Sequence, residues 1–344
     1  MDARPEAGEH LTVVRIDDNA LDPDVHVVRL QSSRATQPAR VGAMIATGDW
    51  GPPMPFATNA RDGRRVYFED DGGQGAPVVI LGGFLDPVEL VRGAPIARAL
   101  QELSQEFRLV YADHRGHGRS DKPHEANAYA MQLRVADVVA VIDELDLERA
   151  HFIGISWGGR LCFGIGEHAP ERVRSLVIIG QQPFAIEADG PLARVVGSAL
   201  NASRERGLEA LVEAFEDIAG RYPESVRALY LDSDAAAMRA AWSAAMNEGA
   251  LCNDLSGWDL RCLICVAAND VDFFDQARRA ADEIPGAEFA MIGGRDHLGM
   301  DTAEVDPILP AVLRTLREPA ARAGAQEGSQ PPRQSVHDGG RRGA

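Results

Sequence analysis

The chain repeats one pattern that restricts its fold to a small set: short, almost wholly apolar runs alternate with longer amphipathic ones. Short apolar runs such as Val78-Val-Ile-Leu81 are typical of central strands in a parallel sheet, which are buried on both faces. The expected strands are 64–69, 78–81, 107–111, 151–155, 175–179, 262–267 and 288–292. The expected helices are 95–104, 131–145, 160–168 and 275–284. Strands that alternate with helices of this length predict βαβ units, and therefore an α/β fold with a mostly parallel sheet.

Residues 183–258 interrupt this alternation. They carry almost no strand signal, but apolar residues recur at helical spacing over 203–219 and 235–247. We therefore expect a helical unit inserted into a core formed by 54–182 and 259–318. The segments before and after the core show neither its strand–helix alternation nor the helical spacing of the inserted unit. Residues 1–53, with one strand-like pattern at 25–30, are expected to be a poorly ordered extension, and residues 319–344 a disordered tail.

The charge balance excludes several classes of partner. The 35 basic residues (Lys and Arg) against 52 acidic ones give a net charge of −17, which repels phosphate backbones and anionic lipid. We therefore expect no nucleic-acid partner and no membrane partner. No apolar run approaches the roughly 20 residues that cross a bilayer, and the N-terminus carries acids where a signal peptide has a basic start. A cytoplasmic protein is expected.

The cysteines and paired histidines give no signal for a disulfide framework, a metal or another cofactor. Cys262 and Cys265 form a C-x-x-C, but they lie in one expected strand, where residues three apart point to opposite faces. They are expected to be buried thiols. His114 and His117 lie in a glycine-rich turn, and no trio of cysteines or carboxylates nearby completes a zinc site. We expect no cofactor and no metal.

Gly154-Ile-Ser-Trp-Gly158 is the motif that points to chemistry. It matches G-x-S-x-G, and an expected strand leads into it while an expected helix leaves it. That context is the strand-turn-helix of a nucleophile elbow, where a strained turn aims the serine hydroxyl outward. Glycines are needed there because side chains would clash in so tight a turn. The alternative is a glycine-rich turn with no catalytic role.

A serine nucleophile needs a base, and in this architecture the base comes last along the chain. Three histidines follow Ser156. His168 lies near the end of the helix after the elbow, and His337 lies in the expected tail. His297 lies on a loop just after the last expected strand, which is where a mobile base belongs. We therefore expect His297 to be the base.

The base needs an orienting carboxylate, and two candidates follow the strand at 262–267. Asp270 comes first after the strand and is favoured, while Asp272 remains its rival. An oxyanion hole needs backbone N–H groups aimed at the developing charge. One is expected from Trp157, just after the nucleophile, and the other from the turn after the strand at 78–81, at Phe84.

Four segments together resemble the α/β-hydrolase superfamily, across about residues 54–318. The run 111–123 (YADHRGHGRSDKP) resembles the family's loop after its fourth strand, and 154–159 its nucleophile elbow. Asn269-Asp270 resembles its acid turn, and Asp296-His297 its base loop. The resemblance implies that residues 183–258 are a cap over the site.

Two departures from the family pattern bear on the site. Gly82-Gly83 stands where the family usually has His-Gly, which loosens the assignment of Phe84. Ala267-Ala268 stands where the acid turn usually starts with glycine, which keeps Asp272 an alternative to Asp270.

The function expected from these residues is that of a serine hydrolase, which cleaves a small carboxylic ester or lactone through an acyl-enzyme on Ser156. One alternative is hydrolysis of a C–C bond or thioester with the same triad. Another is a ligand-sensing protein of the same fold without turnover. Met238, Trp242 and Met246 form a stripe in the inserted segment, which either binds substrate or packs on the sheet.

Overall fold

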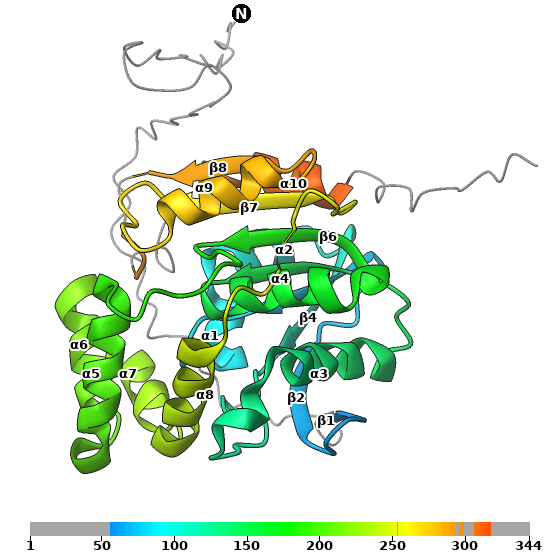
Figure 1. Ribbon diagram of the computed structural model, residues 1–344. Coiled ribbons are helices and arrows are strands. Elements are labelled where there is room, and N and C mark those ends of the chain that lie inside the picture. Colours follow the sequence, from blue (N-terminus) through cyan, green and yellow to red (C-terminus); the bar gives the residue numbers. More distant parts are fainter. Residues whose placement is uncertain (1–55, 253, 294–295, 299–305, 318–344) are drawn as a thin grey trace, which may run out of the picture.

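An eight-stranded sheet forms the centre of the fold, with the strand order β1-β2-β4-β3-β5-β6-β7-β8 (Figure 1). The computed structural model describes residues 56–252, 254–293, 296–298 and 306–317. The strands are β1 (Phe56–Thr58), β2 (Arg65–Asp70), β3 (Ala76–Leu81), β4 (Phe107–Ala112), β5 (Ala150–Ile155), β6 (Val173–Ile179), β7 (Cys262–Ala267) and β8 (Glu288–Ile292). The β1–β2 and β2–β4 pairs are antiparallel, and every other pair is parallel. The predicted α/β fold class is confirmed.

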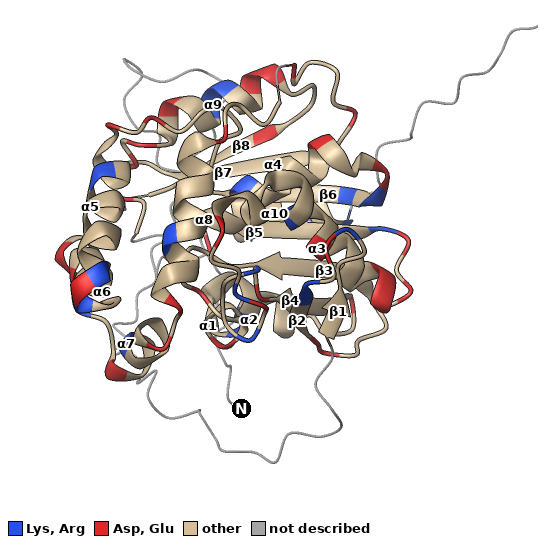
Figure 2. Ribbon diagram, turned by 60° about the horizontal axis from the view of Figure 1, so that its bottom comes forward, with Lys and Arg blue, Asp and Glu red and all other residues tan. Residues whose placement is uncertain are grey.

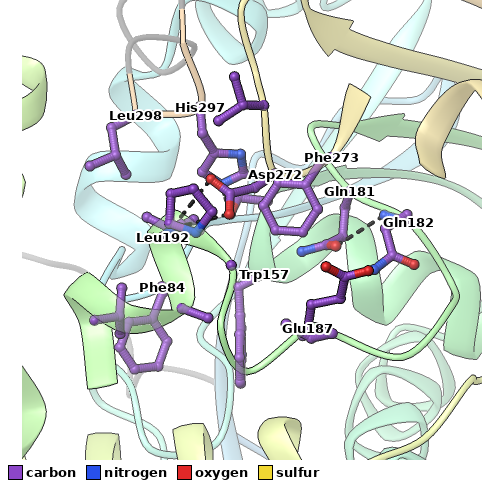
Figure 3. A pocket seen from close by; sticks show the side chains of 18 of the residues that line it. Phe84, Trp157, Gln181, Gln182, Glu187, Leu192, Asp272, Phe273, His297 and Leu298 are labelled. Carbon is purple, nitrogen blue, oxygen red and sulfur yellow. Dashed lines mark hydrogen bonds between the residues drawn. The ribbon is translucent and has the colours of Figure 1, made fainter. Parts of the chain in front are cut away.

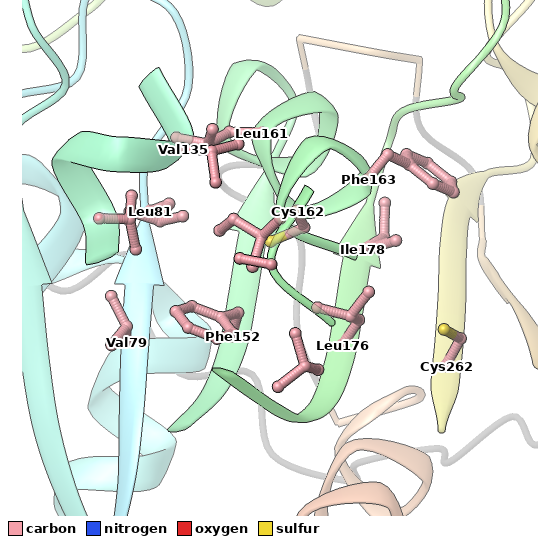
Figure 4. Packing of buried hydrophobic residues seen from close by; sticks show 14 of the residues in the cluster. Val79, Leu81, Val135, Phe152, Leu161, Cys162, Phe163, Leu176, Ile178 and Cys262 are labelled. Carbon is pink, nitrogen blue, oxygen red and sulfur yellow. The ribbon is translucent and has the colours of Figure 1, made fainter. Parts of the chain in front are cut away.

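Helices cover both faces of this sheet. On one face lie α3 (Met131–Glu144), α4 (Trp157–His168) and α9 (Phe274–Glu283), and on the other lie α1 (Val88–Gly93), α2 (Pro95–Gln101) and α10 (Leu309–Arg317). Successive residues of a strand point to opposite faces, so β3 contributes Val79 and Leu81 to the first face and Val78 and Ile80 to the second. Figure 4 shows the packing on the first face, where Phe152 and Cys162 lie at the centre of the cluster.

The four helices between β6 and β7 form a unit of their own, which we call the helical insertion. They are α5 (Pro191–Arg206), α6 (Glu209–Ala219), α7 (Glu224–Leu231) and α8 (Ala235–Asn247). In Figure 1 they stand together beside the sheet. Their buried side chains form a separate cluster, to which the core contributes Leu85 from the loop after β3. This contact joins the insertion to the loop that is expected to hold the oxyanion.

The single helix expected over 203–219 is wrong. The structure has two helices there, because Gly207 adopts a left-handed φ of 60° and ends α5. The chain then turns at Leu208, and α6 begins at Glu209. The expected extension 1–53 and tail 319–344 lie outside the described residues, and so does the strand-like pattern at 25–30.

The two cysteines of the C-x-x-C lie on opposite faces of β7, as predicted. Cys262 packs in the cluster with α3 and α4, and Cys265 packs in the cluster with α1 and α2. Burial raises the pKa of both thiols to about 12, so both remain protonated. Figure 2 shows acidic and basic residues on the helical insertion and α9, whereas the central strands β3 and β5 carry neither. Within the described ranges, no helix combines the length and apolar character that a bilayer crossing requires.

Candidate active site

The serine of the predicted elbow lies between a strand and a helix in a strained backbone conformation. β5 ends at Ile155, α4 begins at Trp157, and Ser156 between them has φ 48° and ψ −106°. The neighbouring glycines make the turn sterically feasible. A Cβ on Gly154 would lie 2.3 Å from the carbonyl oxygen of Gly158, and one on Gly158 would lie 2.3 Å from that of Leu81. The local structure of the elbow is therefore the one the motif predicts.

A chain of hydrogen bonds links Ser156 to a buried carboxylate. Ser156 Oγ lies 2.8 Å from His297 Nε2, and His297 Nδ1 lies 2.8 Å from Asp270 Oδ2. The side chains of His297 and Asp270 are almost excluded from water, with 8% and 1% of each residue exposed. A carboxylate in this position fixes the imidazole so that Nε2 faces the hydroxyl, and it stabilises the imidazolium that forms on proton transfer. The arrangement can generate a serine nucleophile.

The structure pairs Asp270, and not Asp272, with His297. The other carboxylate oxygen of Asp270 accepts hydrogen bonds from the backbone N–H groups of Asp272 and Phe273, at 3.2 Å each. The Phe273 ring packs against the imidazole, with the ring centroids 4.6 Å apart. Asp272 instead accepts a hydrogen bond from the N–H of Leu192 at the start of α5, at 3.1 Å. Asp272 therefore joins the acid turn to the helical insertion.

His168, the next histidine after Ser156, takes no part in this chain of contacts. His168 is exposed and is the last residue of α4, whereas Ser156 lies at the first end of the same helix. His337 lies outside the described residues.

The loop after β3 lies against the elbow. The N–H of Gly158 donates to the carbonyl oxygen of Gly82 at 2.9 Å, and the Phe84 and Trp157 rings pack with their centroids 5.1 Å apart. The N–H of Gly83 is already bound, because it donates to Asp86 Oδ2 at 2.9 Å. The two predicted oxyanion residues, Phe84 and Trp157, therefore lie beside Ser156, and all three line one cavity.

That cavity has a volume of about 480 Å³ and has two kinds of wall (Figure 3). The apolar wall includes Phe84, Leu192, Val196, Phe215, Trp242 and Leu298. The polar wall includes Gln181, Gln182, Glu187, Asp272 and Gln276. A cavity of this size accommodates a small organic molecule.

Of the methionine–tryptophan stripe on α8, only Trp242 lines this cavity. Met238 is completely buried among the helices of the insertion, and Met246 packs in a neighbouring cluster. Residues four positions apart are not exactly aligned along an α-helix, which has 3.6 residues per turn. The three side chains of the stripe therefore contact different neighbours. Neither Met238 nor Met246 lines the cavity, so the structure does not support the substrate-binding role considered for them.

His114 and His117 lie behind the oxyanion loop. His114 Nε2 lies 2.9 Å from the carbonyl oxygen of Gly82, and the His117 ring meets the edge of Phe84. Burial lowers the pKa of His117 to about 4 and that of His114 well below its ordinary value, so both are neutral at pH 7. In the part of the chain that the structure describes, no group of three His, Cys, Asp or Glu side chains is arranged to hold a metal.

Several residues near Ser156 were not identified from the sequence. Gln181 and Gln182 follow β6, and a strand end at the same edge as the elbow is the signal that could have identified them. Asp86 was detectable as an acid in the loop after β3. Its partner Tyr230, 144 residues further along the chain, carries no such signal.

Comparison with known proteins agrees with this geometry. The α/β hydrolase fold family matches residues 76–207, which include β3 through the elbow and into α5. This part of the chain belongs to the α/β-hydrolase superfamily. Among solved α/β-hydrolase structures, an esterase from Exiguobacterium antarcticum superposes with a TM-score of 0.66 at 23% identity, over 77% of this chain and 100% of that one. The shared feature at this identity is the fold.

Two curated relatives match parts of this α/β-hydrolase chain. A putative 2-succinyl-6-hydroxy-2,4-cyclohexadiene-1-carboxylate synthase from Bacillus subtilis is 32% identical over 128 residues, which are 35% of this chain and 44% of the relative. The 3-oxoadipate enol-lactonase 1 of Acinetobacter baylyi is 28% identical over 134 residues, which are 39% of this chain and 48% of that enzyme. The matched stretches thus span less than half of either relative.

Proposed function

We propose that the protein is a serine hydrolase that cleaves a small carboxylic ester or lactone through an acyl-enzyme on Ser156. The observation that carries the proposal is the chain of two 2.8 Å contacts from Ser156 through His297 to Asp270, at the wall of a 480 Å³ cavity. Nucleophile, base and orienting acid are then within hydrogen-bond reach before any substrate binds.

The proposed reaction starts with attack of Ser156 Oγ on the ester carbonyl carbon, as His297 Nε2 takes the hydroxyl proton. Asp270 stabilises the resulting imidazolium. The N–H groups of Trp157 and Phe84 stabilise the oxyanion of the tetrahedral intermediate. His297 then gives its proton to the leaving oxygen, which in a lactone stays attached to the acyl group. Water, activated by the same imidazole, releases the acid and restores Ser156.

The cavity walls favour an uncharged substrate. Apolar surface contributes roughly 25 cal/mol per Å² when it is buried, so the wall that includes Phe84 and Trp242 favours an apolar acyl or alcohol group. The charged groups that line the cavity are mostly acidic. Among the residues that the structure describes, four carboxyl side chains line it with one arginine: Asp86, Glu187, Asp272 and Asp275 with Arg279. This balance disfavours anionic substrates. The curated relative named as an enol-lactonase supports a lactone within this class.

We also propose that the helical insertion acts as a cap. Leu192, Val196 and Phe215, from its first two helices, line the same cavity as Ser156, and so do Tyr230 and Trp242 from the last two. A cap in this position excludes water from the tetrahedral intermediate and selects substrates by shape.

A panel of neutral esters of increasing acyl length, lactones, thioesters and C–C-cleavage substrates tests the proposal, with wild type beside Ser156→Ala. We expect turnover of esters or lactones by the wild type alone. Release of one product equivalent without turnover would instead indicate the ligand-sensing alternative. Turnover confined to thioesters or C–C substrates would keep the triad and replace the substrate class.

A further inference from the structure

The loop after β3 contains a tight turn in an unfavourable backbone conformation. The N–H of Asp86 donates to the carbonyl oxygen of Gly83 at 3.3 Å, which closes a four-residue turn over Phe84 and Leu85. Leu85 has a φ of 78°, a position where such turns usually carry glycine. A leucine in this left-handed region is strained, so other contacts must hold it there.

The helical insertion supplies one of these contacts. The Leu85 side chain is only 1% exposed and packs in the cluster of α5, α6, α7 and α8, with Val196, Leu211 and Met238 among its members. The strained turn and the hydrophobic core of the insertion therefore stabilise each other.

The carboxylate of Asp86 supplies the second contact. Asp86 Oδ2 accepts the N–H of Gly83 at 2.9 Å, and Oδ1 accepts the hydroxyl of Tyr230 at 2.8 Å. Tyr230 belongs to α7 of the insertion and is 7% exposed, whereas Asp86 is half-buried. A carboxylate that loses part of its hydration needs donors in the protein, so both hydrogen bonds stabilise its position.

This bridge lies next to the nucleophile. A Cβ built on Gly83 would be 2.8 Å from Asp86 Oδ2 and 3.9 Å from Ser156 Cβ, so the turn separates the carboxylate from the elbow by one residue. The carboxylate also decides which N–H groups of the turn are available. It occupies the N–H of Gly83, so that group cannot donate to a substrate oxyanion.

We propose that Asp86 and Tyr230 are positioning residues, which couple the cap to the oxyanion hole by holding the Gly83–Asp86 turn so that the Phe84 N–H faces Ser156. The inference rests on the proposed serine-hydrolase function. Neither side chain is assigned a contact with the reacting atoms. Their effect is on the geometry of the donor, which matters most when negative charge develops on the substrate oxygen.

The proposal predicts a specific kinetic signature for Tyr230→Phe. Loss of the hydroxyl leaves Asp86 with one donor fewer and loosens the turn, so the tetrahedral intermediate loses stabilisation while ground-state binding changes little. Complete removal of one oxyanion donor costs roughly 100- to 1000-fold in kcat, so a misplaced donor should cost about 10-fold. KM should stay within about twofold of wild type.

Tyr67→Phe is the matched control. Its hydroxyl donates to Glu69 at 2.7 Å and accepts from the Arg119 guanidinium, so this variant breaks a tyrosine–carboxylate hydrogen bond of similar length and one further contact. It lies on β2, and neither Tyr67 nor Glu69 lines the cavity. Tyr67→Phe is expected to lose at least as much thermal stability as Tyr230→Phe, so a loss of kcat confined to Tyr230→Phe reports on the oxyanion hole and not on general stability.

The experiment measures kcat, KM and the inhibition constant of a trifluoromethyl ketone matched to the best ester of the panel. Such a ketone forms a tetrahedral adduct whose oxyanion uses the same donors. We expect about 10-fold weaker inhibition for Tyr230→Phe and none of this change for Tyr67→Phe. We also expect Asp86→Asn to weaken inhibition, and the double variant Asp86→Asn/Tyr230→Phe to lose less than the sum of the single changes.

The measurements distinguish a failure of the positioning role from a failure of the proposed function. If the wild type cleaves esters and Tyr230→Phe matches Tyr67→Phe in kcat and inhibition, the positioning role is wrong and the proposed function stands. Should KM rise instead while kcat holds, Tyr230 acts in substrate binding, which also overturns the inference. A wild type that neither cleaves esters nor forms the adduct overturns both proposals. If Asp86→Asn does not fold, the Tyr230→Phe comparison with Tyr67→Phe still decides the inference.

Discussion

The N–H of Gly158 donates a hydrogen bond to the carbonyl oxygen of Gly82 at 2.9 Å, which joins the nucleophile elbow to the oxyanion loop. The two segments are 76 positions apart along the chain (158 − 82 = 76), but β3 and β5 are parallel neighbours and end at the same edge of the sheet. The close approach needs a residue without a side chain. A Cβ on Gly158 would lie 2.3 Å from the carbonyl oxygen of Leu81 and 2.8 Å from that of Gly82.

Gly158→Ala should therefore disrupt both halves of the site at once. The added methyl group must push the oxyanion loop away from the elbow, so we expect ester turnover to fall by about 100-fold or more, the scale of a lost oxyanion donor. Gly257→Ala is the control, because nothing lies within 4 Å of a Cβ at that position. Turnover and melting temperature are measured for both variants. Wild-type turnover in Gly158→Ala would contradict the described packing of the elbow.

Asp270→Asn should reduce turnover far more than Asp272→Asn. Only Asp270 contacts His297, and replacing the orienting carboxylate of such a triad with an amide lowers kcat by roughly 10⁴-fold. Asp272→Asn keeps an oxygen that can accept the N–H of Leu192, so its effect should be small. Steady-state kinetics of the two variants provide the comparison. The reverse order would show that Asp272 is the acid.

Trp242→Ala should change substrate preference, because this side chain lines the cavity beside Phe84. We expect the ratio of kcat/KM between short and medium acyl esters to shift. Met238→Ala is the control: it creates a cavity in the core of the insertion, at a cost of about 2–5 kcal/mol in folding free energy, away from the substrate cavity. If Trp242→Ala lowers stability and leaves the ratio unchanged, Trp242 serves only to pack the cap.

His151 should make stability sensitive to mild acid. Burial, with smaller contributions from Arg174 and Arg149, lowers the pKa of His151 to about 4. Between about pH 6.5 and pH 4 the unfolded chain therefore binds more protons at this residue than the folded one, so stability falls as pH falls. From pH 7 to pH 5 this histidine should account for about 2 kcal/mol of lost stability.

Urea unfolding of the wild type and His151→Asn at pH 7 and pH 5 tests this expectation. The variant should lose less stability on acidification than the wild type, by that same amount. Equal losses in the two proteins would show that His151 titrates alike in the folded and unfolded states.

The sequence predicts the sheet well because a strand buried on both faces leaves an unbroken apolar run. The run at 262–267 matches β7 at both ends. Elements at the two ends of the described core were not foreseen: β1, which with three residues is too short to show a period, and α10, Leu309–Arg317. The break at Gly207 was missed because apolar residues on both sides of it continue the helical spacing.

The residues of the candidate site were likewise predicted from the sequence only in part. The nucleophile elbow is a local motif, so the sequence alone places Ser156 and its glycines. The choice between Asp270 and Asp272 depends on which carboxylate faces an imidazole on another loop, so the position of Asp270 nearer the strand end favours it without deciding the choice. The turn at Leu85 contradicts local turn preferences and is held by an insertion more than 100 residues away, a tertiary effect without a local signature.

Covalent modification of Ser156 tests the central claim most directly. The protein is treated with a fluorophosphonate, digested and analysed by mass spectrometry, with Ser156→Ala alongside. We expect one adduct, on the peptide that contains Ser156, and no adduct in the variant, whose ester turnover should fall by about 10⁴-fold or more. Modification at another residue, or undiminished turnover in Ser156→Ala, would contradict this claim.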